Sequence, residues 1–165
     1  MRFFLKLILI SAWLGIIPQS SQVNALCSTP YCPPPWLAFQ GHCYQWVDKQ
    51  MSWMDAERHC QMLSHPGKMV HLASIHSEEE DEFISDYVKE ASGNPSNPPG
   101  YWMGYNDHQQ ENTFTWTDGS DSAYDNWQPR EPNDSNGEDC VERHQFFNKW
   151  NDLDCSNKLT FVCKM

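Results

Sequence analysis

The chain has 165 residues, and its 22 acidic side chains outnumber 11 basic ones to give a formal net charge of −11 at neutral pH. This charge disfavours nucleic acid and other polyanions as partners and favours cations or neutral ligands. Eight tryptophans and an aromatic content of 13% exclude a disordered acidic tail, so we expect one folded domain of ordinary size.

The amino-terminal segment 1–25 has the pattern of a secretory signal peptide. Basic residues flank the start of an apolar run over 7–17, which is too short to span a bilayer, and Ala25 offers a small residue for cleavage. A membrane anchor is the alternative, but the length of the run argues against it. We therefore expect a secreted, extracellular protein that does not insert into membranes, with a single domain over 26–165 that begins with a short arm, 26–31.

Seven cysteines in a secreted chain predict a disulfide framework with one thiol left over. No pair has the close Cys-x-x-Cys spacing of structural zinc sites, so zinc is disfavoured. Cys27 is the odd residue, because it lies just after the predicted cleavage point on the arm. There it is placed to link two chains in a disulfide-bonded homodimer. A Cys27–Cys32 bridge or a free thiol agrees equally well with the sequence.

The first elements of the domain are a predicted hairpin and a predicted helix. Aromatic residues within 36–46, on both sides of Gly41, indicate a short hairpin. The helix is expected to begin at Ser52, whose hydroxyl can cap it, with an acid at Asp55 and apolar residues at helical spacing up to Leu63. Its apolar face is expected to point into the core.

A buried strand over 71–75 and a second helix follow. Ser77 can cap this helix while Glu80 closes a capping box, and Gly93 is expected to end it. The acidic run 78–81 suits the positive end of the helix dipole. We therefore interpret the run as a solvated helix start and not as a metal site.

The second half of the chain predicts short strands separated by loops. Three prolines make 94–100 a loop. Strands are expected at 101–105, 114–116, 139–143, 149–152 and 160–163. Two helices with short, interrupted strands indicate the α+β class with much irregular backbone.

An acidic loop, residues 131–139, is the strongest chemical signal in the sequence. It reads Glu-Pro-Asn-Asp-Ser-Asn-Gly-Glu-Asp, and a second oxygen-rich tripeptide, Trp-Asn-Asp, follows at 150–152. Carboxylate and amide oxygens are the ligands of a hard cation, so the pattern favours Ca²⁺ over zinc or copper. A polar surface turn is the alternative, because the same residue types build turns. A turn, however, does not need so many acids at like-charge distance.

These features resemble the C-type lectin-like domain over residues 32–165. The family's Trp-Ile-Gly-Leu core strand corresponds to residues 102–105, which read Trp-Met-Gly-Tyr and keep the Trp and the Gly. The resemblance implies an α+β fold of two helices, short antiparallel strands and long irregular calcium-binding loops, stapled by disulfides. The implied disulfides are Cys32–Cys43, Cys60–Cys163 and Cys140–Cys155. Since many members of this fold bind neither metal nor sugar, function has to be argued from the site.

The sugar-specificity motif of the family is the most specific part of the resemblance. Residues 131–133 match the mannose-type Glu-Pro-Asn motif, whose Glu-Pro bond is cis in the family, and residues 150–152 match its Trp-Asn-Asp motif. The resemblance implies that the primary Ca²⁺ is bound by Glu131, Asn133, Glu138, Asn151 and Asp152. The implied sugar contacts are Glu131, Asn133, Glu138 and Asn151. Vicinal 3,4-hydroxyls of mannose, glucose or N-acetylglucosamine, or related hydroxyls of fucose, are expected to coordinate the ion.

An auxiliary Ca²⁺ site is expected beside the first. The positions that match the family's auxiliary ligands are Asp107, Glu111, Asp134, Glu138 and Asp139. A cation there would stop Asp134 and Asp139 from repelling their neighbours. The alternative is that Asp107 and Glu111 are exposed loop acids, since matching residue types is easier than matching ligand geometry.

Two functions compete on these residues. The first is a secreted, calcium-dependent lectin for mannose-type glycans on cell or microbial surfaces, in a role such as innate immune recognition. The second is an acidic calcium-binding protein of an extracellular or mineralised matrix, or an ice-binding protein, on the same fold. An enzyme is not expected, because no nucleophile and base stand out and a calcium shell filled by five side chains is not built to generate hydroxide. The complete sugar motif favours the lectin.

Overall fold

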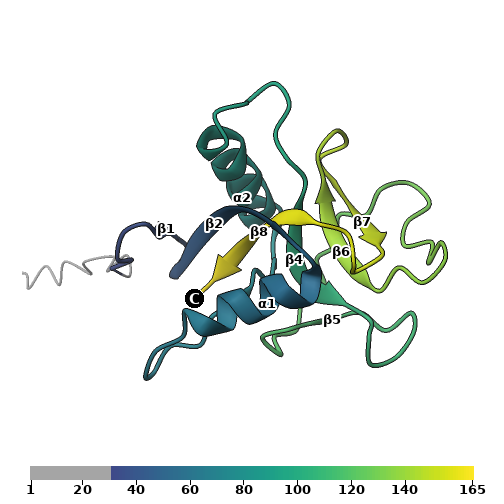
Figure 1. Cartoon of the computed structure of the whole chain (residues 1–165), viewed down its shortest axis with the longest axis horizontal. Coiled ribbons are helices and arrows are strands. Elements are labelled where there is room, and N and C mark those ends of the chain that lie inside the picture. The colour runs from purple at the N-terminus through teal and green to yellow at the C-terminus, as the bar shows by residue number, and fades with distance from the viewer. Residues whose placement is uncertain (1–30) are drawn as a thin grey trace, which may run out of the picture.

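The computed structural model describes residues 31–165 (Figure 1). Its helices are α1 (Trp53–Met62) and α2 (Glu78–Ala91). Its strands are β1 (Leu37–Phe39), β2 (His42–Met51), β3 (His71–Leu72), β4 (Tyr101–Asn106), β5 (Thr115–Trp116), β6 (Cys140–His144), β7 (Lys149–Leu153) and β8 (Leu159–Lys164). The predicted α+β class is confirmed. The predicted signal peptide and Cys27 lie outside the described residues.

The strands form one mixed sheet in the order β1-β2-β8-β4-β6-β7, with β3 beside β8 and β5 beside β4. The expectation of antiparallel strands needs a correction at one pair, because β4 and β8 are parallel. Strand β6 is antiparallel to β4, and β7 is antiparallel to β6, so β7 runs in the same direction as β4. The chain then crosses the sheet from β7 to β8 without changing direction, which makes β8 parallel to β4. Strand β3 is shorter than the strand expected over 71–75.

Both helices begin at the predicted hydroxyl caps. Ser52 Oγ accepts a hydrogen bond from the N–H of Asp55 at 3.4 Å, and Ser77 Oγ accepts one from the N–H of Glu80 at 3.2 Å. Gly93 follows the end of α2 with a φ of 65°, as its predicted role requires. Neither helix has the length and apolar character needed to cross a membrane, within the part of the chain that the structure describes.

The acidic start of α2 is not solvated throughout, and that interpretation was wrong for two of its residues. Glu80 is 5% exposed and Asp81 is 1% exposed. Each is buried because a cation lies against it: Lys164 Nζ is 2.6 Å from Glu80, and Arg143 forms an ion pair with Asp81. The helix dipole favours acids at this position, but it does not require them to face water.

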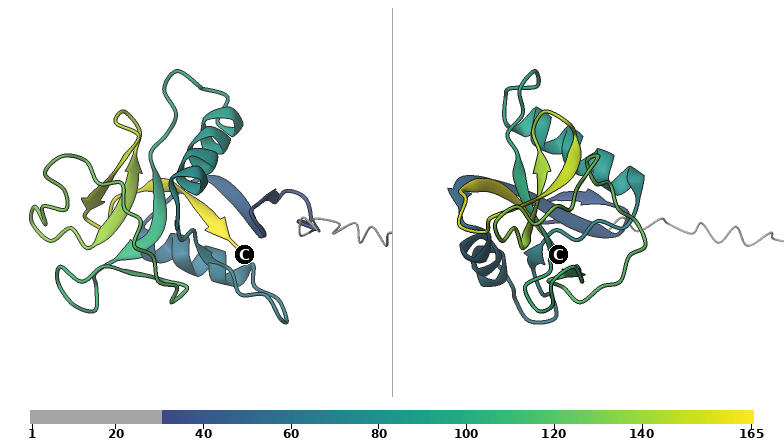
Figure 2. Two further views of the ribbon diagram at one scale, coloured as in Figure 1. Left: turned by 180° about the vertical axis from the view of Figure 1, so that it is seen from behind. Right: turned by 90° about the vertical axis from the view of Figure 1, so that its right-hand side faces the viewer.

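The two helices cover opposite sides of strands β2 and β8 (Figures 1 and 2). Helix α2 contributes Ile84 and Val88 to one hydrophobic cluster, which also holds Trp150. Helix α1 contributes Trp53 and Cys60 to a second cluster. Residues 107–139 connect β4 to β6 and contain the short strand β5. The last part of this segment lies at the end of the molecule opposite β1 (Figure 1).

Gly104 in the core strand β4 permits a close approach of three segments. A Cβ atom at this position would lie 2.6 Å from Thr117 Oγ1 and 2.7 Å from the carbonyl oxygen of Leu72. Side-chain atoms essentially never come this close, so only glycine fits here. This explains why the Gly of the core-strand motif is retained although its neighbours differ.

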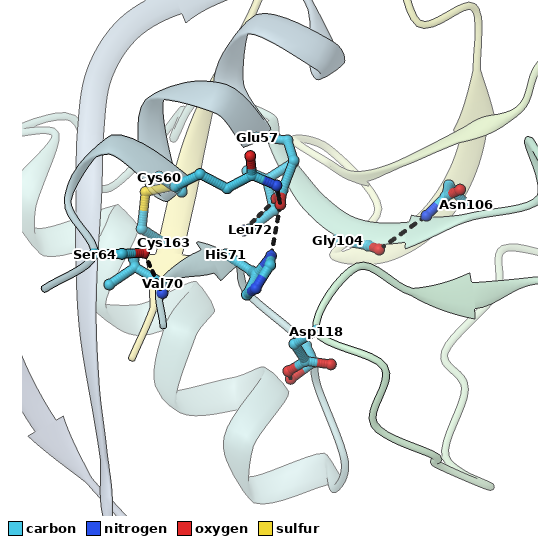
Figure 3. A network of polar contacts seen from close by, with 12 residues as sticks. Glu57, Cys60, Ser64, Val70, His71, Leu72, Gly104, Asn106, Asp118 and Cys163 are labelled. Atoms are coloured by element: carbon cyan, nitrogen blue, oxygen red, sulfur yellow. Dashed lines mark hydrogen bonds and ion pairs between the residues drawn. A yellow bond between two sulfur atoms is a disulfide. The ribbon is translucent and has the colours of Figure 1, made fainter. Parts of the chain in front are cut away.

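A polar network fixes β3 beneath helix α1 (Figure 3). Glu57, itself 5% exposed, accepts a hydrogen bond from the N–H of Leu72 at 2.8 Å, and its other oxygen lies 2.6 Å from His71 Nδ1. Ser64 Oγ accepts a hydrogen bond from the N–H of Val70 at 2.9 Å. These contacts hold the segment after α1 against the helix and place β3 beside β8.

Three disulfides have the pairing that the resemblance implied, namely Cys32–Cys43, Cys60–Cys163 and Cys140–Cys155. Cys60–Cys163 connects α1 to β8 across 103 residues of sequence. Cys140–Cys155 connects the first residue of β6 to the chain just after β7, so both strands of this hairpin are closed at the end where the acidic loop enters.

Candidate functional site

The acidic loop and strand β7 meet at the carboxylate of Asp152. This side chain is 1% exposed and accepts hydrogen bonds from the N–H groups of Asn133 at 2.9 Å and Asp134 at 2.8 Å. The peptide bond between Glu131 and Pro132 is cis, as the resemblance implied. Two segments separated by more than ten residues of sequence are thus brought together at the predicted primary site.

The two predicted amide ligands are oriented by hydrogen bonds through their nitrogens. Asn133 Nδ2 donates to Glu131 Oε2. Asn151 Nδ2 donates to Glu142 Oε1 at 3.3 Å and to the carbonyl oxygen of Asp152 at 2.8 Å. Since an amide has its donors on nitrogen, these contacts leave the side-chain oxygens of both residues to accept or to coordinate.

Glu138, near the carboxyl-terminal end of the acidic loop, is the fifth residue of the predicted primary set. Its N–H donates to Asp134 Oδ1 at 2.9 Å, and its Oε2 accepts from the N–H of Ser135 at 3.1 Å. The loop is thereby folded back on itself. Glu131 and Glu138 each interact electrostatically with Asp152, so the predicted primary residues lie in one acidic neighbourhood.

The electrostatics of this cluster suit a bound cation. Burial raises the pKa of Glu131, and the neighbouring carboxylates of Asp152 and Glu138 raise it further. Burial also raises the pKa of Glu138, and the negative charges of Asp152, Asp134 and Asp154 raise it further. Within residues 31–165, Glu131, Glu138 and Asp152 form no ion pair with Lys or Arg. No Lys or Arg side chain of the described chain therefore offsets their mutual repulsion.

The predicted auxiliary residues also converge. Carboxylate oxygens of Glu111, Asp134 and Asp139 all lie within 4.8 Å of one another. Asp107 is 3% exposed, and its Oδ1 has no hydrogen-bond partner. Burial raises the pKa of Asp107, and the charge of Asp139 adds to the effect. A buried carboxylate oxygen without a partner beside three further carboxylates fits a hard cation such as Ca²⁺.

Glu142 is a site residue that the sequence prediction missed. It lies in β6 beside Asn151, is 7% exposed, and burial raises its pKa to about 7. The Asn151 amide opposes this rise by donating to the carboxylate. The sequence did contain a signal for this residue. Glu142 is an acid within the strand expected at 139–143, and a strand that packs against a core usually carries apolar residues.

One further ligand-like cluster has no metal-binding chemistry. His108 Nε2 lies 3.4 Å from the sulfur of Cys140 and 3.7 Å from that of Cys155. The two cysteines are disulfide-bonded, so neither supplies the thiolate that zinc requires.

Comparisons with known proteins agree with the fold. The family model described as Lectin C-type domain matches residues 49–165. A C-type lectin of Thrasops jacksonii, a lectoxin, is 36% identical over 162 residues, covering 94% of this chain and 96% of that protein. The crystal structure of the C-type lectin CEL-I from Cucumaria echinata has a TM-score of 0.75 and 29% identity, over 82% of this chain and 97% of the other. A calcium-independent type II antifreeze protein has a TM-score of 0.71 and 29% identity, over 82% and 94%. The expected C-type lectin-like fold is confirmed.

Proposed function

The chain belongs to the C-type lectin domain family, and from this premise we propose that it is a secreted lectin that binds mannose-type glycans through calcium. One observation supports the proposal above all others. The Glu-Pro-Asn loop meets strand β7 at Asp152, so that five oxygen-bearing side chains gather with three carboxylates that no Lys or Arg of the described chain neutralises. An external divalent cation would remove this repulsion.

In this proposal the primary ion is held by Glu131, Asn133, Glu138, Asn151 and Asp152. Bound Ca²⁺ supplies open coordination positions for two neighbouring sugar hydroxyls. The protein would select those hydroxyls through its own groups, because the carboxylates of Glu131 and Glu138 can accept hydrogen bonds from hydroxyl groups and the second N–H of Asn133 can donate one to a hydroxyl oxygen. Glu142 holds the amide of Asn151 so that its oxygen stays free for the ion. No catalytic step is part of this function.

A second ion and a paired molecule extend the same proposal. Asp107, Glu111, Asp134, Glu138 and Asp139 would hold an auxiliary Ca²⁺ that neutralises the other side of the acidic loop. A homodimer linked through Cys27 would present two sugar sites. Because a single sugar site binds weakly, two linked sites gain avidity on cell or microbial surfaces through effective concentration.

The alternative function is a matrix or ice-binding protein on the same fold. The observation that favours it is the likeness to an antifreeze protein that is described as calcium-independent. Such a protein would bind ice or mineral through the surface of its loops, and it would need neither the vicinal hydroxyls of a sugar nor a bound calcium ion. The two functions therefore differ in how binding responds to a chelator.

A glycan array probed with calcium, with chelator and with calcium restored tests the proposal. The protein is expected to bind mannose-type glycans in calcium, to lose this binding in chelator, and to regain it when calcium is restored. The double variant Glu131→Gln and Asn133→Asp creates the Gln-Pro-Asp motif of the family's galactose binders, so its binding is expected to move toward galactose. Asp121→Asn, an exposed acid outside both clusters, serves as the control and is expected to behave as the natural chain does. If the protein binds no glycan on the array in calcium but adsorbs to ice or mineral, the alternative function is supported instead.

A further inference from the structure

A buried carboxylate outside both acidic clusters connects helix α2 to the site. Asp81 is 1% exposed and accepts hydrogen bonds from four side chains. The donors are Arg143 Nη1, Asn126 Nδ2 at 2.7 Å, Tyr124 OH at 3.0 Å and Trp150 Nε1 at 3.1 Å. They come from β6, from the long loop before the acidic segment, and from β7, so one side chain contacts three parts of the chain that surround the site.

Two donors to Asp81 come from segments that lead into predicted calcium ligands, since Asn126 belongs to the segment just before Glu131 and Trp150 belongs to β7. Trp150 immediately precedes the two ligands of β7. The main chain continues the connection, because the N–H of Trp150 donates to the carbonyl oxygen of Asn126 and the N–H of Gln128 donates to the carbonyl oxygen of Trp150, each at 2.9 Å. The stem of the loop, residues 124–128, is thereby fixed against β7 just before Glu131.

We propose that Asp81 is a positioning residue for the calcium and sugar site, an inference that rests on the proposed function. Asp81 touches neither the ion nor the sugar. It holds the loop stem 124–128 and Trp150 in place, so that the ligands that follow each of them face one another. The stem forms no helix or named strand. It contacts β7 through these hydrogen bonds, through the bridge between Trp127 and Trp150, through a hydrogen bond from Lys149 Nζ to Asn126 Oδ1, and through packing of Tyr124 on Trp150. Groups that hydrogen-bond directly to a metal ligand typically change metal affinity by about 10- to 100-fold when they are removed. Asp81 acts one contact further out, so an effect at the low end of this range is expected.

Glu80, the preceding residue, offers a matched control. It is also a buried carboxylate of the first turn of α2, at 5% exposure. Its partners are Tyr44 OH, the N–H of His76 and Lys164 Nζ, which belong to β2, to the start of the helix and to β8. None of them leads to the acidic loop. Replacing Glu80 therefore disturbs the framework at the same helix without disturbing the loop stem.

The experiment compares Asp81→Asn with Glu80→Gln in the full secreted chain. Three properties are measured: Ca²⁺ affinity by titration, the thermal midpoint in chelator, and amide hydrogen exchange of calcium-free protein. Asp81→Asn is expected to lower Ca²⁺ affinity by about tenfold or more and to accelerate exchange in 124–135. Glu80→Gln is expected to lower the thermal midpoint at least as much, while Ca²⁺ affinity changes by less than about twofold.

A second variant covers the case in which Asp81→Asn does not fold. Tyr124→Phe removes one donor to Asp81 from the loop side, and its hydroxyl makes no other hydrogen bond within the described chain, so it is expected to reduce Ca²⁺ affinity by about threefold with the same acceleration of exchange in the stem. Unchanged exchange and affinity in both variants would overturn the proposal, as would an equal loss of affinity in Glu80→Gln. A natural chain that binds no calcium would contradict the proposed function, whereas the exchange measurement, which needs no calcium, would still decide the role of Asp81.

Discussion

The buried acids at the start of α2 and the acids of the loop 131–139 differ in what neutralises them. Glu80 and Asp81 are each paired with a cation of the protein, Lys164 and Arg143. Glu131 and Glu138 have no such partner within residues 31–165, and burial raises the pKa of both. The first pair belongs to a framework that is complete once the chain has folded. In the proposed function, a cation from solution completes the loop.

This difference has an energetic basis. A buried ion pair balances its desolvation cost within the fold, so removing one partner leaves a charge that nothing else can neutralise. Carboxylates gathered near the surface repel one another until a cation binds, and solvent reduces this repulsion. Equivalent substitutions in the two regions should therefore have opposite effects on the free energy of unfolding. The following changes test the contrast in order of decreasing effect.

The largest effect is expected for Lys164→Met, which leaves Glu80 buried without its cation. We expect a loss of about 3 to 5 kcal/mol in the free energy of unfolding, measured by urea denaturation at neutral pH. The double variant with Glu80→Gln is the control, since a neutral amide no longer needs the ammonium group and should recover most of the loss. Equal stability of the single variant and the natural chain would show that the ion pair does not support the framework.

An intermediate effect is expected for Glu142→Gln in chelator. The folded state raises the pKa of Glu142 from 4.5 to about 7, so the folded chain binds this proton more tightly than the unfolded chain. Stability from this group is present below pH 4.5 and is lost as the pH rises through about 7. At pH 8 the Gln variant should therefore be more stable than the natural chain by on the order of 2 kcal/mol, with little difference near pH 4.5.

Urea denaturation at both pH values measures the effect of Glu142→Gln, with Glu82→Gln as the control. Glu82 is an exposed acid of α2, so its replacement should leave the pH dependence of stability unchanged. A Glu142→Gln variant that is less stable than the natural chain at pH 8 would mean that the charged carboxylate stabilises the fold.

The smallest effect on folding, with the opposite sign to that of Lys164→Met, is expected for Glu131→Gln. Removing one charge from the loop should raise the stability of calcium-free protein by less than about 1 kcal/mol, because solvent screens this partly exposed group. The same change should lower Ca²⁺ affinity by about tenfold or more, since it replaces a carboxylate ligand by a neutral one. Calorimetric titration and thermal unfolding in chelator measure the two effects. A destabilised calcium-free variant would remove the contrast between the two regions.

Features that depend on a few neighbouring residues could be predicted from the sequence. The caps at Ser52 and Ser77 each need a hydroxyl and an N–H three residues apart, and both were predicted correctly. The acidic loop likewise concentrates its donors within nine residues of sequence. The disulfide pairing was different, because it came from the resemblance and the spacing alone left it open.

Features that depend on distant partners could not be predicted in this way. The donors to Asp81 lie 43, 45, 62 and 69 residues further along the chain, and none of them is unusual in its own segment. The helix-start rule therefore assigned this acid to solvent. The parallel pairing of β4 and β8 was missed for the same reason, since β8 lies between β2 and β4, and both of these strands are far from it in the sequence.

The Cys140–Cys155 bond bears on what the loss of calcium would do in the proposed function. It closes the hairpin of β6 and β7, which bears Asn151 and Asp152, by a covalent link between residues only 15 apart. Loss of calcium would then reduce the order of the loop 131–139 and leave the domain folded. The sugar would be released with the ion, and the same molecule could bind both again.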